Sequence, residues 1–274
     1  MSQKYVFLDV DGTLVDFEGR LPHSAESALR QAQQNGHRLI LCTGRQKSQI
    51  YPWLLKKILF DGIISSSGAN VEYKGKNIAR HFFSSGKLQA LLNLFYQKKI
   101  PFCLQTEQRL YAEPWCTKGI FDYFMQNGID PDKMVNLFGD LTPVQSAGEL
   151  TNVEKVVYYN ADAEVSAMRK AVGADYQIAG YSFGDLCAVN GEVSLSSVNK
   201  ATGIRDCLQH CGASVQDSVA VGDGDNDMDM IHFANIGIAM GNATQELKQI
   251  ADFITDSIDC DGLKKAFEMI HLIY

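Results

Sequence analysis

Short apolar runs alternate with amphipathic stretches at both ends of the chain. The runs are bounded by Gly, Asp, Ser or Asn, the pattern of strands buried on both faces of a sheet. The stretches between them carry apolar residues at helical spacing. This repetition predicts an α/β fold with a doubly wound parallel sheet. We expect strands at Tyr5–Leu8, Arg38–Cys42, Gly62–Ile64, Ser218–Val221, Ile236–Ala239 and Phe253–Thr255, and helices at Ser24–Asn35, Gln46–Leu59, Lys200–Cys211 and Asp227–Ala234.

The middle of the chain, from about His81 to about Val189, follows a different pattern. Strands and helices occur there in pairs, which predicts an α+β insertion within the α/β sequence. We expect a discontinuous core domain of residues 1–83 and 188–274 and an inserted domain of residues 84–187. The insertion's expected helices are Ser85–Lys98, Thr117–Gln126 and Ala163–Val172, and its expected strands are Phe102–Thr106, Arg109–Ala112, Glu154–Asn160, Tyr176–Ser182 and Leu186–Val189.

Composition and charge narrow the class of protein. The 274 residues are 46% hydrophobic and 21% charged, as in a globular chain with a sizeable core. A net charge of −7 disfavours nucleic acid and anionic membrane surfaces as partners. The start of the chain lacks a signal-peptide pattern, no segment approaches ~18 uninterrupted apolar residues, and seven scattered cysteines form no Cys-x-x-Cys pair. We therefore expect a cytoplasmic protein, of unknown oligomeric state.

Two aspartates follow the first expected strand, in Asp9-Val10-Asp11-Gly12-Thr13. The carboxyl ends of strands line the ligand crevice of an open α/β sheet. Residues i and i+2 of an extended chain share a face, so both carboxylates can address one site. Two acids placed together are costly unless a cation or a shared proton relieves the repulsion. The alternative is an ordinary Asp-Gly turn at a strand end.

A second acidic loop, Gly222-Asp223-Gly224-Asp225-Asn226-Asp227, also follows an apolar strand. It is not an EF-hand, because Met228 stands where that loop needs Gly and Ala234 where it needs Glu. It lacks the third Gly of a dinucleotide fingerprint, and the chain has no Walker A run. A parallel sheet brings this loop beside Asp9, which predicts an oxygen-rich pocket suited to Mg²⁺.

Two weaker signals accompany the acidic loops. Thr43-Gly44-Arg45 offers a hydroxyl, amides and a cation at another strand end, which together can hold a phosphate. Most strand-Thr-Gly turns are only turns, however. Lys200 opens an expected helix before the second acidic loop, and a lone lysine is usually a solvated surface group. Neither signal predicts a site by itself.

In this order, the motifs resemble those of the haloacid dehalogenase (HAD) superfamily, and specifically its Cof-type phosphatase branch. The resemblance covers the whole chain and implies a Rossmann-like core with an inserted type IIB cap between the Thr and Lys motifs. Relatives commonly carry Asn-Gly-Ala where this chain has Ser67-Gly68-Ala69, which puts in doubt any contact that the Asn would provide. The matching motifs are Asp9-x-Asp11-Gly12-Thr13-Leu14, Thr43-Gly44-Arg45, Lys200 and Gly222-Asp223-Gly224-Asp225-Asn226-Asp227-x-x-Met230.

The resemblance implies a Mg²⁺-dependent phosphatase that works through an aspartyl-phosphate. Asp9 is then the nucleophile, and Asp11 protonates the leaving alcohol and later activates water, a task that requires a raised pKa. Mg²⁺ is held by Asp9, Asp223 and the Asp11 backbone carbonyl, and Asp227 contributes through water. The implied phosphate-binding groups are Thr43, Lys200, Asn226 and the amides of Val10 and Gly44.

Three functions remain open from the sequence. The first is a phosphatase for a small phosphorylated metabolite, such as a sugar phosphate. A phosphomutase uses the same aspartyl-phosphate but returns the phosphoryl group to a sugar. A non-catalytic regulatory protein is disfavoured, because unneeded buried acids destabilise a fold. The implied cap would select the substrate, with Tyr111, Glu113 and Trp115 as candidate contacts.

Overall fold

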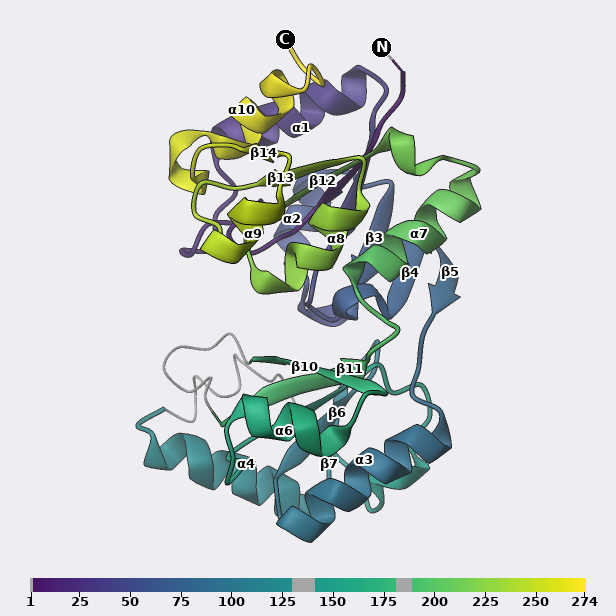
Figure 1. Ribbon diagram of the computed structural model, residues 1–274, viewed down its shortest axis with the longest axis vertical. Helices are drawn as coiled ribbons and strands as arrows, with labels where there is room; N and C mark the ends of the chain where they lie inside the picture. The colour runs from purple at the N-terminus through teal and green to yellow at the C-terminus, as the bar shows by residue number, and fades with distance from the viewer. Residues whose placement is uncertain (1, 130–140, 181–188) are drawn as a thin grey trace. The chain divides into compact units, whose positions relative to one another are not determined.

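The computed structural model describes residues 2–129, 141–180 and 189–274 (Figure 1). The chain divides into two compact units, the first of Met1–Arg80 with Val198–Tyr274 and the second of His81–Ser197. The insertion expected at residues 84–187 lies within the second unit. Among the helices of the described ranges, none has the length and apolar character needed to cross a membrane.

The first unit is built on a mixed sheet in the order β14-β13-β12-β1-β2-β3-β4-β5. The strands from β14 to β3 are parallel, as predicted, whereas β4 and β5 form an antiparallel hairpin that was not predicted. Lys74 and Gly75 join this hairpin with positive φ angles of 48° and 74°, which suit a tight hairpin turn. The strands are β1 (Tyr5–Leu8), β2 (Arg38–Cys42), β3 (Gly62–Ser65), β4 (Asn70–Tyr73), β5 (Lys76–Arg80), β12 (Ser218–Gly222), β13 (Ile236–Ala239) and β14 (Phe253–Ile254).

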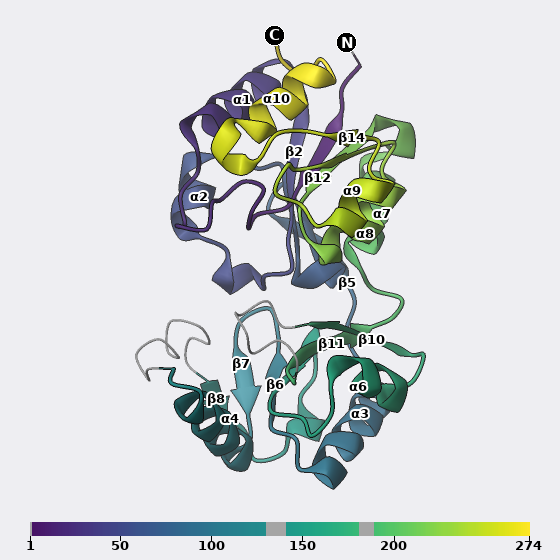
Figure 2. The same ribbon diagram turned by 60° about the vertical axis from the view of Figure 1, so that its left-hand side comes forward.

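Helices cover both faces of this sheet (Figure 2). Val6 and Leu8 of β1 pack in one apolar core with helices α1, α2 and α10, whereas Tyr5 and Phe7 pack in another with α7, α8 and α9. This alternation is the period of two that a strand buried on both faces requires, so the doubly wound α/β fold is confirmed. The helices are α1 (His23–Gln34), α2 (Pro52–Lys57), α7 (Lys200–Cys211), α8 (Met228–Phe233), α9 (Gln245–Ile250) and α10 (Gly262–Met269).

Two helix predictions in the first unit need correction. The stretch Gln46–Leu59 is not one helix, because a 3₁₀ turn at Lys47–Gln49 is followed by a break before α2 begins at Pro52. Proline lacks an N–H and disfavours helical geometry in the preceding residue, which explains the break. The first helix spans His23–Gln34 rather than Ser24–Asn35, and no side-chain hydrogen bond caps its start.

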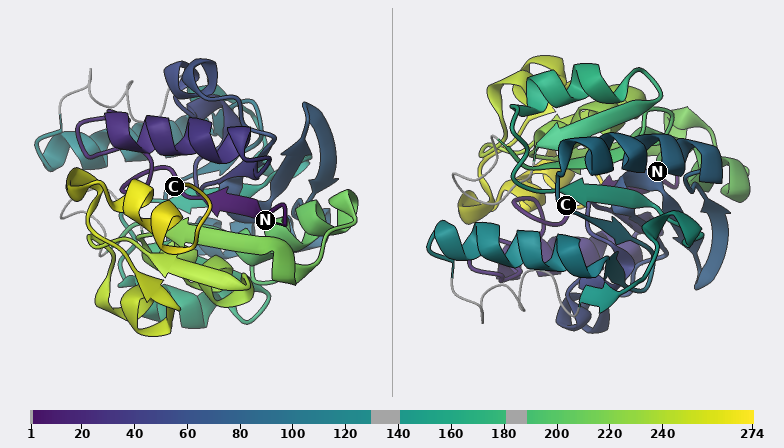
Figure 3. Two further views of the ribbon diagram at one scale, coloured as in Figure 1. Left: turned by 90° about the horizontal axis from the view of Figure 1, so that it is seen from above. Right: turned by 90° about the horizontal axis from the view of Figure 1, so that it is seen from below.

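The second unit is an α+β layer with its sheet in the order β10-β11-β9-β6-β7-β8. Helices α3, α4 and α6 pack against the sheet and are nearest the viewer in the right-hand view of Figure 3. Strands β8 and β11 were not predicted, and the predicted strand Leu186–Val189 lies mostly outside the described residues. The elements are α3 (Ser85–Lys98), β6 (Phe102–Gln105), β7 (Leu110–Ala112), α4 (Pro114–Gln126), β8 (Leu141–Pro143), β9 (Lys155–Tyr158), α6 (Val165–Val172), β10 (Tyr176–Gly180) and β11 (Gly191–Leu195).

Candidate active site

The acidic loops meet because the strands that precede them are neighbours in the sheet. β1 pairs in parallel with β12 on one side and with β2 on the other. The amide of Asp9 extends the β1–β12 ladder by donating to the Val221 carbonyl at 3.0 Å, and Asp223 follows two residues later. Thr43 follows β2, and its amide donates to the Ile64 carbonyl of β3 at 2.9 Å. Three segments that are far apart in the sequence therefore end at one edge of the sheet.

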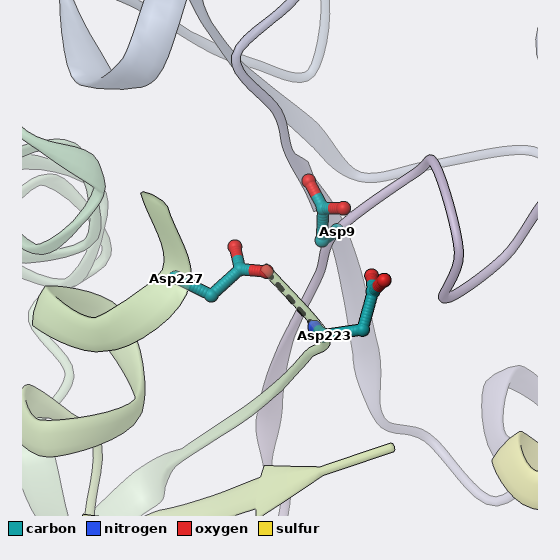
Figure 4. Close-up of side chains that lie close together, drawn as sticks. All are labelled: Asp9, Asp223 and Asp227. Atoms are coloured by element: carbon teal, nitrogen blue, oxygen red, sulfur yellow. Dashed lines mark hydrogen bonds between the residues drawn. The ribbon is translucent and has the colours of Figure 1, made fainter. Parts of the chain in front are cut away.

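Three carboxylates form a cluster at this edge. One oxygen atom from each of Asp9, Asp223 and Asp227 lies within 4.8 Å of the others (Figure 4). Lys200 Nζ donates to Asp9 Oδ1 at 2.5 Å and also to Asp227 Oδ1, and the lysine side chain has no exposed surface. When all four groups are ionised, the three carboxylates outnumber the one ammonium group, so two negative charges are not neutralised.

This imbalance of charge shifts the proton affinities of the cluster. Burial, and then the charge of Asp227, raise the pKa of Asp9 well above its ordinary value. The same two causes raise the pKa of Asp223 to about 7. Burial alone lowers the pKa of Lys200, but Asp227 and Asp9 outweigh it, so its pKa is raised and the amine is charged. Buried carboxylate oxygens with excess negative charge fit a hard divalent cation, so this acidic cluster could hold a metal ion.

Asp227 is the most fully engaged acid of the cluster. Its Oδ1 accepts from Lys200, and its Oδ2 accepts at 2.9 Å from the amides of both Asp223 and Gly224. The side chain is fully buried. A Cβ on Gly222 would lie only 2.6 Å from the Asp227 carboxylate carbon, so glycine is needed at that position. Asp227 therefore fixes both the lysine and the turn that carries Asp223.

Asp223 is held by two residues that the sequence analysis did not assign to the site. Thr13 Oγ1 donates to Asp223 Oδ1 at 2.9 Å, and Asn242 Nδ2 lies 3.3 Å from Asp223 Oδ2. Gly12 has a φ of 81°, and a Cβ there would lie 2.1 Å from Asp223 Oδ2. The glycine expected to turn the chain thus also gives room to the carboxylate.

Asp11 points to a different partner. Arg45 Nε and Nη2 donate to the two Asp11 carboxylate oxygens at 2.6 and 2.8 Å, a bidentate ion pair. The guanidinium lies 4.4 Å from the centroid of the Tyr51 ring, and Nη1 donates to the Gln49 carbonyl at 3.1 Å. Arg45, the cation of the weak Thr43-Gly44-Arg45 signal, is therefore bound to Asp11 in this structure. Tyr51 also belongs to this group and was missed.

Several of the expected phosphate-binding groups lie close together. Thr43 is buried, and its hydroxyl accepts from the amide two residues further on. A Cβ on Gly44 would lie 3.3 Å from Asn226 Nδ2 and 3.5 Å from Ser67 Oγ, so both polar groups border the Gly44 backbone. Val10 buries its side chain in the apolar core, which leaves its backbone as the part available for binding.

The three candidate substrate contacts in the second unit all have contacts within that unit. Glu113 is nearly buried, and its carboxylate accepts hydrogen bonds from Tyr96 Oη, Trp115 Nε1 and the Ala147 amide, each at 2.7 or 2.8 Å. These donors lower the pKa of Glu113 against the opposing effect of burial. Tyr111 packs against the apolar core of this unit. Glu113 and Trp115 thus have partners within this unit, and their role as substrate contacts stays a prediction.

Three residues of the site were not predicted, and the sequence indicates them to different degrees: Thr13, Asn242 and Tyr51. Thr13 lies within the first motif, and its hydroxyl could have been assigned to the second loop once the two strands were paired. Asn242 is a polar residue shortly after the strand Ile236–Ala239, the same placement that singled out Asp9 and Asp223. Tyr51 carried no signal, because its contact with Arg45 depends on the break before Pro52.

Comparison with known proteins agrees with this arrangement of loops. A model of the haloacid dehalogenase-like hydrolases matches residues 6–267. The chain belongs to this family. Its motifs at the carboxyl ends of β1, β2 and β12 are those on which the resemblance to HAD proteins was recognised. The fold and the family predicted from the sequence are thus confirmed.

Individual HAD proteins are similar over their whole length. Phosphatase YwpJ of Bacillus subtilis strain 168 is 25% identical over 292 residues, which cover 98% of this chain and 100% of YwpJ. A crystal structure from Geobacillus kaustophilus HTA426 is 26% identical with a TM-score of 0.81, covering 99% of this chain and 100% of that one. The HAD subclass IIB sugar phosphatase BT4131 is 25% identical with a TM-score of 0.79 at the same coverage. This chain is accordingly a HAD hydrolase of the phosphatase type.

Proposed function

We propose that this hydrolase is a Mg²⁺-dependent phosphatase that cleaves a small phosphorylated metabolite through a phosphoryl group carried on Asp9. The observation that carries the proposal is the buried cluster of three carboxylates around one lysine. Asp9 is the carboxylate of this cluster that follows the central strand β1. Its Oδ1 is bonded to Lys200, so Oδ2 is the oxygen that remains for attack on phosphorus.

The reaction divides into two transfers at phosphorus. In the first, an Asp9 oxygen forms a bond to phosphorus while the bond to the leaving oxygen breaks, and Asp11 donates a proton to that oxygen. In the second, water attacks the phosphorus of the Asp9 acyl phosphate and gives its proton to Asp11. Inorganic phosphate leaves, and the Asp9 carboxylate is restored.

Asp11 must break hydrogen bonds to Arg45 before it can donate a proton. Both of its carboxylate oxygens accept from Arg45, so proton donation requires at least one of these hydrogen bonds to break. An incoming phosphate dianion competes with Asp11 for the Arg45 guanidinium, since both anions suit bidentate binding. Substrate binding would in this way free the Asp11 carboxylate, which must take up a proton from solvent before it can act as the acid of the first transfer.

The negative charge of the transferring group needs donors and cations around it. Lys200, Thr43 and Asn226 are proposed to bind its oxygens, together with the amides of Val10 and Gly44. When bound at Asp9, Asp223 and the Asp11 backbone carbonyl, Mg²⁺ supplies the charge that offsets repulsion between two anions. Asp227 acts indirectly, because its oxygens are already engaged by Lys200 and two amides.

The second unit, His81–Ser197, is proposed as the cap that selects the substrate. The core recognises the phosphate, which all phosphomonoesters share, so discrimination must come from groups outside the core loops. A folded insertion between the sequence motifs of an active site commonly gates that site. Resemblance to the subclass IIB sugar phosphatase BT4131 favours a phosphorylated sugar as the substrate class.

Release of inorganic phosphate from a panel of phosphomonoesters tests the proposal. We expect Mg²⁺-dependent release by the wild-type protein. The Asp9→Asn variant should be folded and should lose on the order of 10⁴-fold or more in kcat, because an amide of the same shape is no nucleophile. Activity near the wild-type level in purified Asp9→Asn would refute the nucleophile assignment. Isomerisation of a sugar phosphate that depends on a bisphosphate would instead indicate a mutase.

A further inference from the structure

Asn242 lies where the segments after four strands meet. It follows β13, and its side chain bonds to residues that follow β1, β12 and β14. Nδ2 donates to the Gly12 carbonyl at 2.9 Å and to Asp223 Oδ2 at 3.3 Å. Oδ1 accepts from the Ile258 amide at 2.9 Å. One side-chain amide thus joins both acidic loops to the turn after the last strand of the sheet.

These bonds hold the Asp223 carboxylate from two sides. Oδ1 accepts from Thr13 and Oδ2 from Asn242, so each oxygen takes one neutral donor. Two donors in fixed positions oppose rotation of the carboxylate, and each oxygen keeps a further acceptor site. Asp223 is therefore preorganised before a cation arrives.

We propose that Asn242 is a positioning residue that sets the orientation of Asp223 and thereby the affinity of the site for Mg²⁺. The proposal rests on the function proposed above. Hydrogen bonds from outside a metal site to its carboxylates typically contribute 10- to 100-fold to metal affinity. The two ends of the amide have separate tasks, because Oδ1 anchors the turn at Ile258 while Nδ2 faces the acidic loops.

Asn242→Ala tests the proposal, with Asn35→Ala as the matched control. Asn35 lies in the same unit and also donates to a backbone carbonyl, that of Leu272 at 2.7 Å, away from the acidic loops. The dissociation constant for Mg²⁺ is measured by calorimetry without substrate, and kcat is measured at saturating Mg²⁺ with an aryl phosphate. We expect the dissociation constant to rise about 10- to 100-fold in Asn242→Ala and to be unchanged in Asn35→Ala. At saturating Mg²⁺, kcat should fall much less.

Circular dichroism and thermal unfolding show whether the variant is folded. If Asn242→Ala is unfolded, Asn242→Leu, which keeps the number and branching of the side-chain heavy atoms, takes its place in the same measurements. Failure of both variants to fold would make Asn242 a structural residue and overturn the proposal. Equal Mg²⁺ affinity in a folded variant and the wild type would also overturn it, while leaving the proposed function intact. Absence of Mg²⁺ binding by the wild type would reject both.

Discussion

Lys200 Nζ lies 2.5 Å from Asp9 Oδ1, and neither side chain has appreciable contact with solvent. The lysine is the first residue of α7, whereas the aspartate follows β1, so the two are joined only through the folded sheet. An ammonium group buried among carboxylates offsets repulsion that would otherwise oppose folding. Lys200 therefore stabilises the unliganded protein, and we propose that it also supplies charge for phosphate binding.

Lys200→Met should destabilise the protein by roughly 3–5 kcal/mol without metal, the usual result of breaking a buried ion pair. Urea unfolding in the presence of EDTA measures this loss. Mg²⁺ should recover part of it, because a divalent cation replaces the missing positive charge. Lys155→Met is the control, since Lys155 is a nearly buried lysine paired with Glu192 at 2.6 Å in the second unit. A similar recovery by Mg²⁺ in the control would contradict the explanation.

Asp11→Asn should lower kcat by about 10²–10⁴-fold, the usual contribution of a general acid and base. The loss should be larger for alkyl phosphates than for an aryl phosphate, whose leaving group needs less protonation. Steady-state kinetics with both substrate types measure the difference. Asp16→Asn is a matched control, because Asp16 also pairs with an arginine, Arg20, in the same region of the chain. Equal losses for the two substrate types would argue against a role as acid.

Removal of divalent metal with EDTA should abolish phosphate release, and Mg²⁺ should restore it. Ca²⁺ should restore little, because it takes more ligands at longer distances than Mg²⁺ and tolerates bidentate carboxylates, which would occupy the attacking oxygen. Phosphate release is followed after dialysis against EDTA and stepwise addition of each ion. Full activity in metal-free buffer would end the metal hypothesis.

The affinity for Mg²⁺ should fall as the pH is lowered below about 7. Burial and Asp227 raise the pKa of Asp223 to about 7, and a cation can bind only the ionised carboxylate. For one displaced proton the apparent affinity falls about tenfold per pH unit. Without metal, the stability of the folded state depends on pH in the opposite direction. Protonation of Asp223 favours the folded state, so this contribution to stability is present at low pH and is lost as the pH rises through 7.

Thermal unfolding with and without Mg²⁺ at pH 6, 7 and 8 tests the pH dependence of both the Mg²⁺ affinity and the stability. The shift in Tm caused by Mg²⁺ should increase across this series. A shift that is constant with pH would show that Asp223 is not the group that titrates. The Glu113 carboxyl, whose pKa is lowered in the second unit, should contribute no change over this range.

Exchange of residues 81–197 for the corresponding unit of a HAD phosphatase with a different substrate should transfer substrate preference. The core should keep its kcat for a minimal aryl phosphate within a few fold, because the loops proposed to bind phosphate are unchanged. Relative kcat/KM values across a panel of sugar phosphates measure the transfer. A chimera that retained the preference of its core would show that this unit is not the selector.

Local features of the sequence were enough to predict the fold class and the acidic loops. Short continuous apolar runs located the predicted strands of the first unit to within a residue, because both faces of a central strand must be apolar. Asp9 and Asp223 were then assigned to one site by a general property of parallel sheets, whose carboxyl ends share an edge. The strands β8 and β11 of the second unit were missed, and so was the hairpin of β4 and β5. The hairpin depends on a Lys-Gly turn that gives a weak local signal.

Only the tertiary structure decided which residues the side chains of the candidate site contact. Lys200 is separated from Asp9 by 191 positions, and Asn242 is separated from Gly12 by 230. The sequence alone allowed Lys200 to be a solvated surface lysine, but it is fully buried. Arg45 pairs with Asp11 because the break before Pro52 brings Tyr51 and the Gln49 carbonyl beside the guanidinium. The periodicity of apolar residues indicates which face of each segment packs against the core. Contacts between side chains that are far apart in the sequence depend on how distant segments pack together.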